Sequence, residues 1–394
     1  MAYASRTEKL RGEGAYQVLA RAQALEASGH DIVHLEIGEP DFATPERVSG
    51  AGIEAIRSGQ TRYNPPAGLS ALRERIAEEA GRRRGLSFRP QQVVVSPGAK
   101  PNLFFPTLAL INPGDEVIYP DPGFPTYSAM ITVAGGIPVP VPLLEENSFS
   151  FDLRAFDRLI SKRTRLIIIN SPGNPTGGVM PADDLRHVAE TAIRRDCWVL
   201  SDEIYTQILF DGKKAASIAS VPGMMDRTVI VDGFSKTYAM TGWRLGFGIM
   251  PETLAERVGL LLTHSVGCTA HFTQIAGLQA LSGPQDSVRA MVSEYQRRRD
   301  LLVAGLNRLP GVSCQLPQGA FYAFPNIRRT GLSSGELADR MLDGGVALLP
   351  GSAFGQYGEG YLRLAYANSL ENIKLALQRM EAVLNDQQAQ GRGS

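Results

Sequence analysis

Residues 165–205 read RLIIINSPGNPTGGVMPADDLRHVAETAIRRDCWVLSDEIY, and this stretch decides the fold. Two short apolar runs, Arg165–Ile169 and Val199–Ser201, stand on either side of a segment with helical spacing, Ala182–Arg195. Apolar strands that alternate with helices are typical of a mostly parallel sheet that is covered on both faces. The stretch therefore predicts one strand–helix–strand unit of an α/β protein.

The same alternation extends outward from this unit. Further runs of strand character lie at Val93–Val95, Val117–Tyr119, Ile137–Val141, Thr228–Val231 and Leu245–Ile249. We expect residues 46–285 to form a large three-layer domain with helices on both sides of the sheet. After Pro284 the pattern becomes rich in helices with short strands, which predicts a smaller α+β domain over residues 286–386. Residues 1–45 are expected to give an N-terminal arm and part of the small domain, and residues 387–394 a disordered tail.

The composition excludes several classes of protein. The chain has 394 residues, with 40 Lys and Arg against 40 Asp and Glu, so its formal net charge is zero. Nucleic acids and anionic membranes favour partners with a basic excess, and we expect neither as a partner. No apolar run approaches the ~18 residues of a spanning helix, and the first ten residues lack the apolar core of a secretory signal.

The cysteines and histidines give no sign of a disulfide frame or a metal site. Cys197, Cys268 and Cys314 are odd in number and widely spaced, which favours reduced thiols and a cytoplasmic location. The five histidines are scattered without the spacing of metal ligands, so we expect no bound metal.

Two helix starts are specific enough to predict. Thr44 is expected to cap a helix that runs to Ser58, with a proline at its first position. Ser333 and Glu336 form the pattern of a capping box. The overlapping segment Gly331–Gly335 matches the G-x-S-x-G pattern of hydrolases, but no strand precedes it, so it predicts no nucleophile.

Side chains that carry chemistry follow four of the predicted strands. Ligands of an open parallel sheet bind beyond the carboxyl ends of its strands, so we expect these side chains to converge. The turn Gly98–Lys100 opens a helix, and the free N–H groups and positive dipole of such a start suit a phosphate. Asn174 lies at the centre of a rigid loop of prolines and glycines, and Asp202 and Tyr205 follow the strand at 199–201.

The last of these strand ends carries a lysine. Ser235, Lys236 and Arg244 lie within ten residues of one another, after the strand at 228–231. A lysine in a largely apolar, aromatic setting can have a depressed pKa and act as a Schiff-base amine. The four strand ends thus offer a phosphate turn, an amine, a carboxylate for a protonated ring nitrogen and a phenol for a ring hydroxyl. These match the attachment points of pyridoxal 5′-phosphate, which we expect as the cofactor.

Six motifs, in this order, resemble those of the class I and II aminotransferases, which are pyridoxal-phosphate enzymes of fold type I. They are Gly38–Phe42, Tyr63 with Gly68, Ser171–Gly177, Asp202–Tyr205, Ser235–Arg244 and Arg363–Ala367. The resemblance implies a ping-pong reaction, through aldimine and ketimine, that moves the amino group of an L-amino acid to a 2-oxo acid. In this family 2-oxoglutarate is the default acceptor. The resemblance also implies a homodimer whose two subunits both contribute to each site.

The resemblance implies three catalytic residues. Lys236 would form the internal aldimine with the cofactor and then move the proton of the reaction. Asp202 would pair with the pyridinium nitrogen and keep the ring an electron sink. Tyr205, together with Asn174, would hydrogen-bond the phenolic oxygen of the ring, while Phe124 would stack on the ring face.

The resemblance also implies the remaining binding residues. The phosphate ligands would come from two turns and from the partner subunit: Gly98, Ala99, Lys100, Ser235, Arg244 and the partner subunit's Tyr63. Arg363 would bind the substrate α-carboxylate with its planar fork, assisted by Asn174 and the backbone of Gly38. Tyr16 would lie near the mouth of the pocket.

Two other functions use the same scaffold. A carbon–sulfur β-lyase, or another elimination enzyme, would use the same lysine and cofactor. A non-catalytic ligand sensor is more remote, because such regulators usually carry a fused DNA-binding module, and we expect none in a chain of neutral net charge without an N-terminal extension. The presence of Lys236, Asp202 and Arg363 together also favours retained catalysis.

The sequence leaves the amino donor open. In subgroups that act on aspartate or prephenate, a lysine at the place of Lys100 can meet a distal carboxylate. Tyr16 at the pocket mouth would instead permit an aromatic or apolar substrate.

Overall fold

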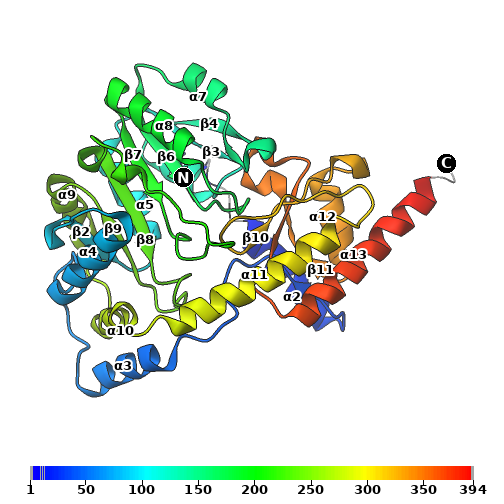
Figure 1. Ribbon diagram of the computed structural model, residues 1–394, viewed down its shortest axis with the longest axis horizontal. Helices are drawn as coiled ribbons and strands as arrows, with labels where there is room; N and C mark the ends of the chain where they lie inside the picture. Colours follow the sequence, from blue (N-terminus) through cyan, green and yellow to red (C-terminus); the bar gives the residue numbers. More distant parts are fainter. Residues whose placement is uncertain (1–2, 9, 11, 13, 392–394) are drawn as a thin grey trace.

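The computed structural model describes residues 3–8, 10, 12 and 14–391 (Figure 1). Its largest sheet has the strand order β2-β9-β8-β7-β6-β3-β4-β5. These strands are β2 Val93–Ser96, β3 Glu116–Asp121, β4 Ile137–Leu144, β5 Ser150–Phe151, β6 Thr164–Asn170, β7 Trp198–Asp202, β8 Thr228–Gly233 and β9 Gly246–Ile249. Neighbouring strands from β4 through β3, β6 and β7 to β8 pair in parallel, whereas β5, β9 and β2 run antiparallel to their neighbours. The sheet is therefore mostly parallel, as the sequence predicts.

Helices cover both faces of this sheet because successive strand residues point to opposite sides. Val94 and Leu200 pack with helices α5 (Lys100–Leu110), α6 (Thr126–Val133) and α9 (Glu252–Thr263). Val93 packs on the other face with α4 (Ser70–Arg84) and α10 (His271–Ser282), and Val199 packs there with α7 (Leu153–Leu159) and α8 (Ala182–Arg195). Helix α3 (Glu46–Arg57) lies outside α10. This three-layer arrangement confirms the predicted α/β class.

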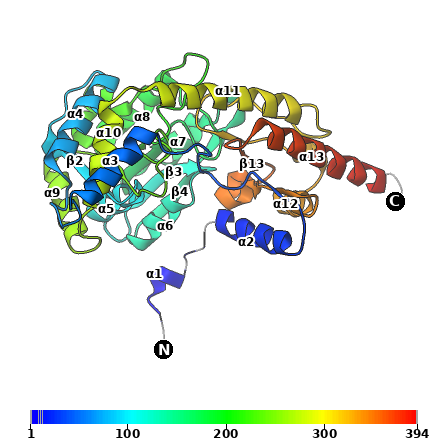
Figure 2. The same ribbon diagram turned by 90° about the horizontal axis from the view of Figure 1, so that it is seen from below.

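A second hydrophobic core lies at the far end of the long helix α11 (Asp286–Leu306), which runs there from the sheet (Figure 1). It is built from α12 (Ser334–Asp343), α13 (Leu370–Gly391) and an antiparallel sheet of β10 (Tyr322–Ala323), β13 (Leu362–Ala365) and β12 (Leu349–Pro350). Strand β1 (Val33–His34) pairs in parallel with β11 (Val346–Ala347), so the N-terminal segment joins this part of the molecule. Helix α2 (Gly14–Ala27) lies on the same side as α12 in Figure 2. The predicted domain limits of 1–45, 46–285 and 286–386 stay a prediction.

Three local expectations have different outcomes. The capping box is confirmed, because the side chain of Ser333 accepts from the N–H of Glu336, and the side chain of Glu336 accepts in return. Thr44 does not cap α3, since its hydroxyl donates instead to the carbonyl of Ala239 at 2.6 Å. The tail expected at 387–394 is helical as far as Gly391, because α13 continues over residues that favour helix. Residues 392–394 lie outside the described part of the chain.

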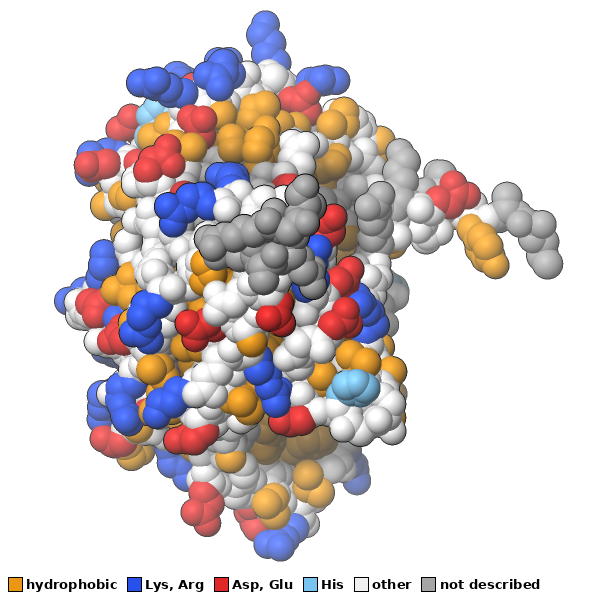
Figure 3. Space-filling model, turned by 90° about the vertical axis from the view of Figure 1, so that its right-hand side faces the viewer, with side chains coloured by type: hydrophobic (Ala, Val, Ile, Leu, Met, Phe, Trp, Pro, Cys, Tyr) orange, Lys and Arg blue, Asp and Glu red, His pale blue; other side chains and the backbone are white. Residues whose placement is uncertain are grey.

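On the face seen in Figure 3, basic and acidic side chains are interspersed rather than gathered by sign. Within the described ranges, no helix combines the length and apolar character needed to cross a membrane. In the same residues, no three His, Cys, Asp or Glu side chains gather into a group able to hold a metal ion.

Candidate active site

Lys236 lies in the turn after β8, and its amine contacts the N-terminal segment. Its Nζ donates a hydrogen bond of 2.6 Å to the carbonyl of Gly38 and lies 5.7 Å from the centre of the Phe321 ring. Burial lowers the pKa of Lys236 to about 8; Glu39 opposes this shift and three nearby cationic side chains add to it. An amine with this pKa is partly unprotonated near neutral pH, so it can act as a nucleophile.

Asp202 ends β7 and is almost fully buried. The hydroxyl of Tyr127 donates to its Oδ2 at 2.7 Å, and the backbone N–H of Ile204 donates to its Oδ1 at 3.3 Å. Burial raises the pKa of Asp202 to about 6; these two hydrogen bonds oppose the shift, whereas Asp232 and Glu203 add to it. A carboxylate in this setting is stabilised by a cationic partner.

Tyr205 and Tyr322 form a buried pair of phenols with their hydroxyl oxygens 2.8 Å apart. Tyr205 follows β7, whereas Tyr322 comes from β10 in the smaller part of the molecule. A Cβ atom at Gly38 would lie 2.1 Å from the hydroxyl oxygen of Tyr322, so a side chain there would displace the phenol. The Gly38 carbonyl, which accepts the hydrogen bond from the Lys236 amine, thus lies close to both phenols.

The turn at Gly98 lies against the guanidinium of Arg244. Gly98 has a φ of +86°, and a Cβ atom there would lie 2.1 Å from Nη2 of Arg244. Ala99 is the residue before α5, so the turn opens a helix as predicted. Ser235 is buried in the neighbouring turn, directly before Lys236. A helix start beside a guanidinium suits a multiply charged anion.

Arg363 in β13 is buried where the two parts of the molecule meet the N-terminal segment. Its Nη2 donates to the carbonyl of Glu36, and its Nη1 donates to Oδ1 of Asn174 at 3.4 Å. The guanidinium carbon lies 4.7 Å from the centre of the Tyr322 ring and 5.0 Å from that of Phe354. These aromatic contacts fix the plane of a fork that matches a carboxylate.

Of the other predicted binding residues, two lie beside the site and two are exposed at the surface. Phe124 meets the ring of Tyr127 edge-on at 5.8 Å, and Nζ of Lys100 lies 5.3 Å from the centre of the Phe124 ring. Tyr63, in the loop between α3 and α4, is 97% exposed, and Tyr16, in α2, is 65% exposed. The fold of one chain thus brings Phe124 and Lys100 beside the residues above and leaves Tyr63 and Tyr16 at the surface.

Sequence reasoning missed two tyrosines that contact the predicted residues. Tyr127 lies in the first turn of α6, three positions after Phe124, and its N–H donates to the carbonyl of Phe124 at 3.0 Å. This short spacing could have indicated that both rings belong to the site. Tyr322 has no such signal in the sequence, since it is 117 positions from Tyr205 and the two side chains meet only when the chain folds.

The chemistry of these groups indicates which cofactor the site fits. An unprotonated amine combines with an aldehyde, a buried carboxylate favours a protonated ring nitrogen, and a helix start beside an arginine favours a phosphate. Pyridoxal 5′-phosphate carries all three groups on one small ring. The side chains present fit that molecule, and together with the three-layer sheet they define the class of pyridoxal-phosphate enzymes.

Comparison with known proteins narrows this class to a family. The sequence profile named aminotransferase class I and II matches residues 30–380, and the chain belongs to this family. It is a pyridoxal-phosphate-dependent amino-acid aminotransferase of fold type I. The predicted family, fold, cofactor and reaction class are therefore confirmed.

Relatives of this chain are named for different substrates. It is 40% identical over 390 residues to aromatic-amino-acid aminotransferase 2 of Thermococcus litoralis, covering 98% of this chain and 99% of that one. It is 41% identical over 360 residues to an aspartate aminotransferase of Pyrococcus abyssi, covering 90% and 92%. Among solved structures, aspartate aminotransferase from Thermus thermophilus with maleate gives a TM-score of 0.92 at 37% identity, covering 97% of this chain and 100% of that one.

Proposed function

We propose that the enzyme moves the amino group of an L-amino acid to 2-oxoglutarate, with Lys236 and Arg363 at the two ends of the reacting group. One observation carries this proposal, which is that both side chains contact the same short segment of backbone. Lys236 donates to the carbonyl of Gly38, and Arg363 donates to the carbonyl of Glu36. Carbonyls two residues apart are separated by at most ~7 Å. A substrate whose α-carboxylate lies on Arg363 therefore has its α-carbon within reach of the lysine amine.

The residues around this segment account for the cofactor. Its phosphate is assigned to the turn at Gly98, Ala99 and Lys100 with Ser235 and Arg244, its ring nitrogen to Asp202, its ring oxygen to Tyr205 and Asn174, and its ring face to Phe124. When bound, the cofactor supplies an electron sink that allows the α-carbon of the amino acid to lose a proton. Lys236 Nζ, with a pKa of about 8, accepts this proton near neutral pH.

We infer that the substrates carry a second carboxylate. Nζ of Lys100 lies over the Phe124 ring, and its charge lowers the pKa of Lys236, so this ammonium is close to the reacting amine. A cation in this place favours aspartate or glutamate as donor and 2-oxoglutarate as acceptor. Maleate, which is bound by the Thermus thermophilus relative, is also a dicarboxylate.

The half-reaction distinguishes transfer from elimination. Holoenzyme mixed with aspartate in the absence of an acceptor is expected to give one 2-oxo acid per site without ammonia. Later addition of 2-oxoglutarate should give glutamate. Release of stoichiometric ammonia would support the elimination alternative. In a panel of donors, faster reaction of tyrosine than of aspartate would contradict the inferred dicarboxylate preference.

We propose that the enzyme works as a homodimer, in which the partner subunit's Tyr63 completes each phosphate site. Ile53 and Ile56 on α3, close in sequence to Tyr63, are 50% and 51% exposed. Large apolar side chains exposed together favour burial against another protein surface.

We also propose a cytoplasmic location, which suits three cysteines that are all free.

Mixing two defective variants tests the shared site. Tyr63→Ala chains and Lys236→Ala chains are expected to be poorly active alone, because each homodimer has the same defect in both sites. After subunit exchange in equal amounts, half of the dimers carry one intact site, so activity should rise to about a quarter of the wild-type value. Activity that stays at the average of the two separate variants would contradict a role for Tyr63 across the interface.

A further inference from the structure

Arg84 ends α4 and is buried behind strands β7 and β8. Its Nη2 lies 2.6 Å from Oε2 of Glu203 and 3.5 Å from Oδ2 of Asp232. The side chain of Arg84 is 6% exposed and those of both carboxylates are 4% exposed. We call these three residues the buried ion cluster. Such a cluster depends on its one cation, because each ion has lost its water.

Further donors contact both carboxylates of the buried ion cluster, while burial raises the pKa of Asp232 and the charge of Arg84 opposes that shift. The hydroxyls of Ser201 and Ser217 donate to Oε1 of Glu203 at 3.0 Å and 2.6 Å. The backbone N–H of Gly233 donates to Oδ1 of Asp232 at 2.7 Å. One guanidinium therefore faces two carboxylates that are held by further donors.

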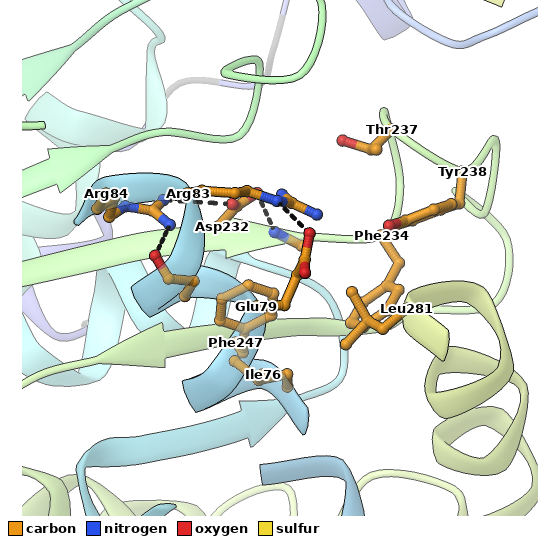
Figure 4. A pocket seen from close by; sticks show the side chains of 12 residues that line it. Ile76, Glu79, Arg83, Arg84, Asp232, Phe234, Thr237, Tyr238, Phe247 and Leu281 are labelled. Carbon is orange, nitrogen blue, oxygen red and sulfur yellow. Dashed lines mark hydrogen bonds and ion pairs between the residues drawn. The ribbon is translucent and has the colours of Figure 1, made fainter. Parts of the chain in front are cut away.

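Other charges near the cluster are already matched to each other. Figure 4 shows Arg84 beside Asp232 and Arg83 beside Glu79, with Tyr238 facing them from the turn after β8. Nε of Arg83 lies 2.9 Å from Oε1 of Glu79. Arg84 is thus the guanidinium within ion-pair distance of both Glu203 and Asp232 among the residues described.

The buried ion cluster lies directly behind Asp202. Asp202 is paired in register with Val231, so Glu203 and Asp232 are the next residues along the two strands. The side chain of Asp202 faces α6, whereas Arg84 reaches the two carboxylates from α4 on the other side of the sheet. Strands lie ~4.8 Å apart, so these charges act on Asp202 at short range. Both carboxylates indeed raise the pKa of Asp202.

We propose that Arg84 is a positioning residue for the cofactor, whose charge offsets Glu203 and Asp232 and so keeps Asp202 ionised to hold a protonated ring nitrogen. The proposal rests on the role proposed above for Asp202. Without Arg84, two buried carboxylates behind Asp202 would lack their cation, and the three coupled carboxylates, Asp202 among them, would take up protons at higher pH. The other polar groups that face Asp202 are the hydroxyl of Tyr127, the phenol of Tyr205 and the N–H of Ile204, and all three would stay in place.

The test measures the dissociation constant of pyridoxal 5′-phosphate for the cofactor-free protein across the pH range in which Asp202 titrates. The pKa of Asp202 is about 6. If Arg84→Gln raises this pKa by about one unit, binding is expected to weaken on the order of tenfold at about pH 5 and by roughly twofold near neutral pH. Affinity falls when Asp202 takes up a proton. The pH below which binding weakens should therefore move upward in this variant.

Three further variants separate charge from simple damage to the fold. Arg84→Lys keeps the cation and should retain most of the affinity. Arg84→Gln combined with Glu203→Gln restores the net charge of the buried ion cluster and should recover both the affinity and the pH dependence. Arg82→Gln, on the same helix with a side chain that is 71% exposed, should leave both unchanged. Equal impairment of the single and double glutamine variants, or a pH dependence that does not move, would overturn the proposal.

Asp202→Asn, measured in parallel, distinguishes this proposal from the one on which it rests. If Asp202→Asn binds the cofactor as tightly as wild type, the role of Asp202 itself is wrong. If Asp202→Asn weakens binding and Arg84→Gln does not, only the inference about Arg84 fails.

Discussion

Lys236→Ala is expected to lower kcat for transamination by about 10⁴-fold or more, the upper range for a lost general acid–base group. Its amine is the one that is placed at the Gly38 carbonyl with a pKa of about 8, and both cofactor attachment and proton transfer are assigned to it. Borohydride reduction followed by peptide mapping measures the attachment directly. The wild-type protein should carry the cofactor on the peptide that contains Lys236, and the variant should carry none.

Lys100→Ala is the matched control for this experiment. Lys100 is also a lysine beside the site, but its ammonium lies over the Phe124 ring at the start of α5. The Lys100→Ala protein should keep a reducible bond to Lys236. A reducible bond that survives in Lys236→Ala would move the attachment to another lysine and contradict the assignment.

Arg363→Lys is expected to raise KM about a hundredfold for amino acids and 2-oxo acids alike, equivalent to ~2.8 kcal/mol of binding. Every substrate of the reaction carries the same carboxylate next to the reacting carbon, so the effect should not depend on the side chain. The flat guanidinium of Arg363 is held between Tyr322 and Phe354, and it offers two parallel donors. A lysine ammonium can neither replace the flat guanidinium against the two aromatic rings nor bind both carboxylate oxygens in the same plane.

Arg328→Lys provides the comparison for this variant. Arg328 also stacks on an aromatic ring, that of Tyr361 at 4.7 Å, but it lies outside the site. Its replacement should leave KM within a factor of about two, as for most surface changes. Steady-state kinetics with aspartate and 2-oxoglutarate measure both variants, and an unchanged KM in Arg363→Lys would remove the arginine from carboxylate binding.

The sequence predicts the large sheet well because its signals are local. Branched residues recur at strand spacing, helical segments lie between them, and the reactive residues Asp202 and Lys236 directly follow two strands. A residue that follows a strand is placed at the edge of the sheet by the chain itself. The positions of Asp202 and Lys236 thus follow from strand order alone.

Contacts between distant segments could not be predicted in this way. Tyr322 meets Tyr205 and Arg363 meets Glu36 only because the smaller part of the molecule packs against the sheet and the N-terminal segment. Thr44 illustrates the same limit at a helix start. Its sequence favours a cap, but a tertiary hydrogen bond to Ala239 takes its hydroxyl instead. A local capping preference is overridden wherever the folded chain offers the polar side chain a more favourable hydrogen-bond partner.

The segment Glu36–Gly38, which is contacted by both Arg363 and Lys236, has a consequence for how substitutions act at a distance. The covalent main chain limits the separation of these two carbonyls to ~7 Å, whichever side chains surround them. A change elsewhere in the N-terminal segment would therefore displace the carboxylate-binding and proton-accepting groups together. Such substitutions should alter KM and kcat in concert, whereas replacement of one of the two side chains acts on its own end of the substrate.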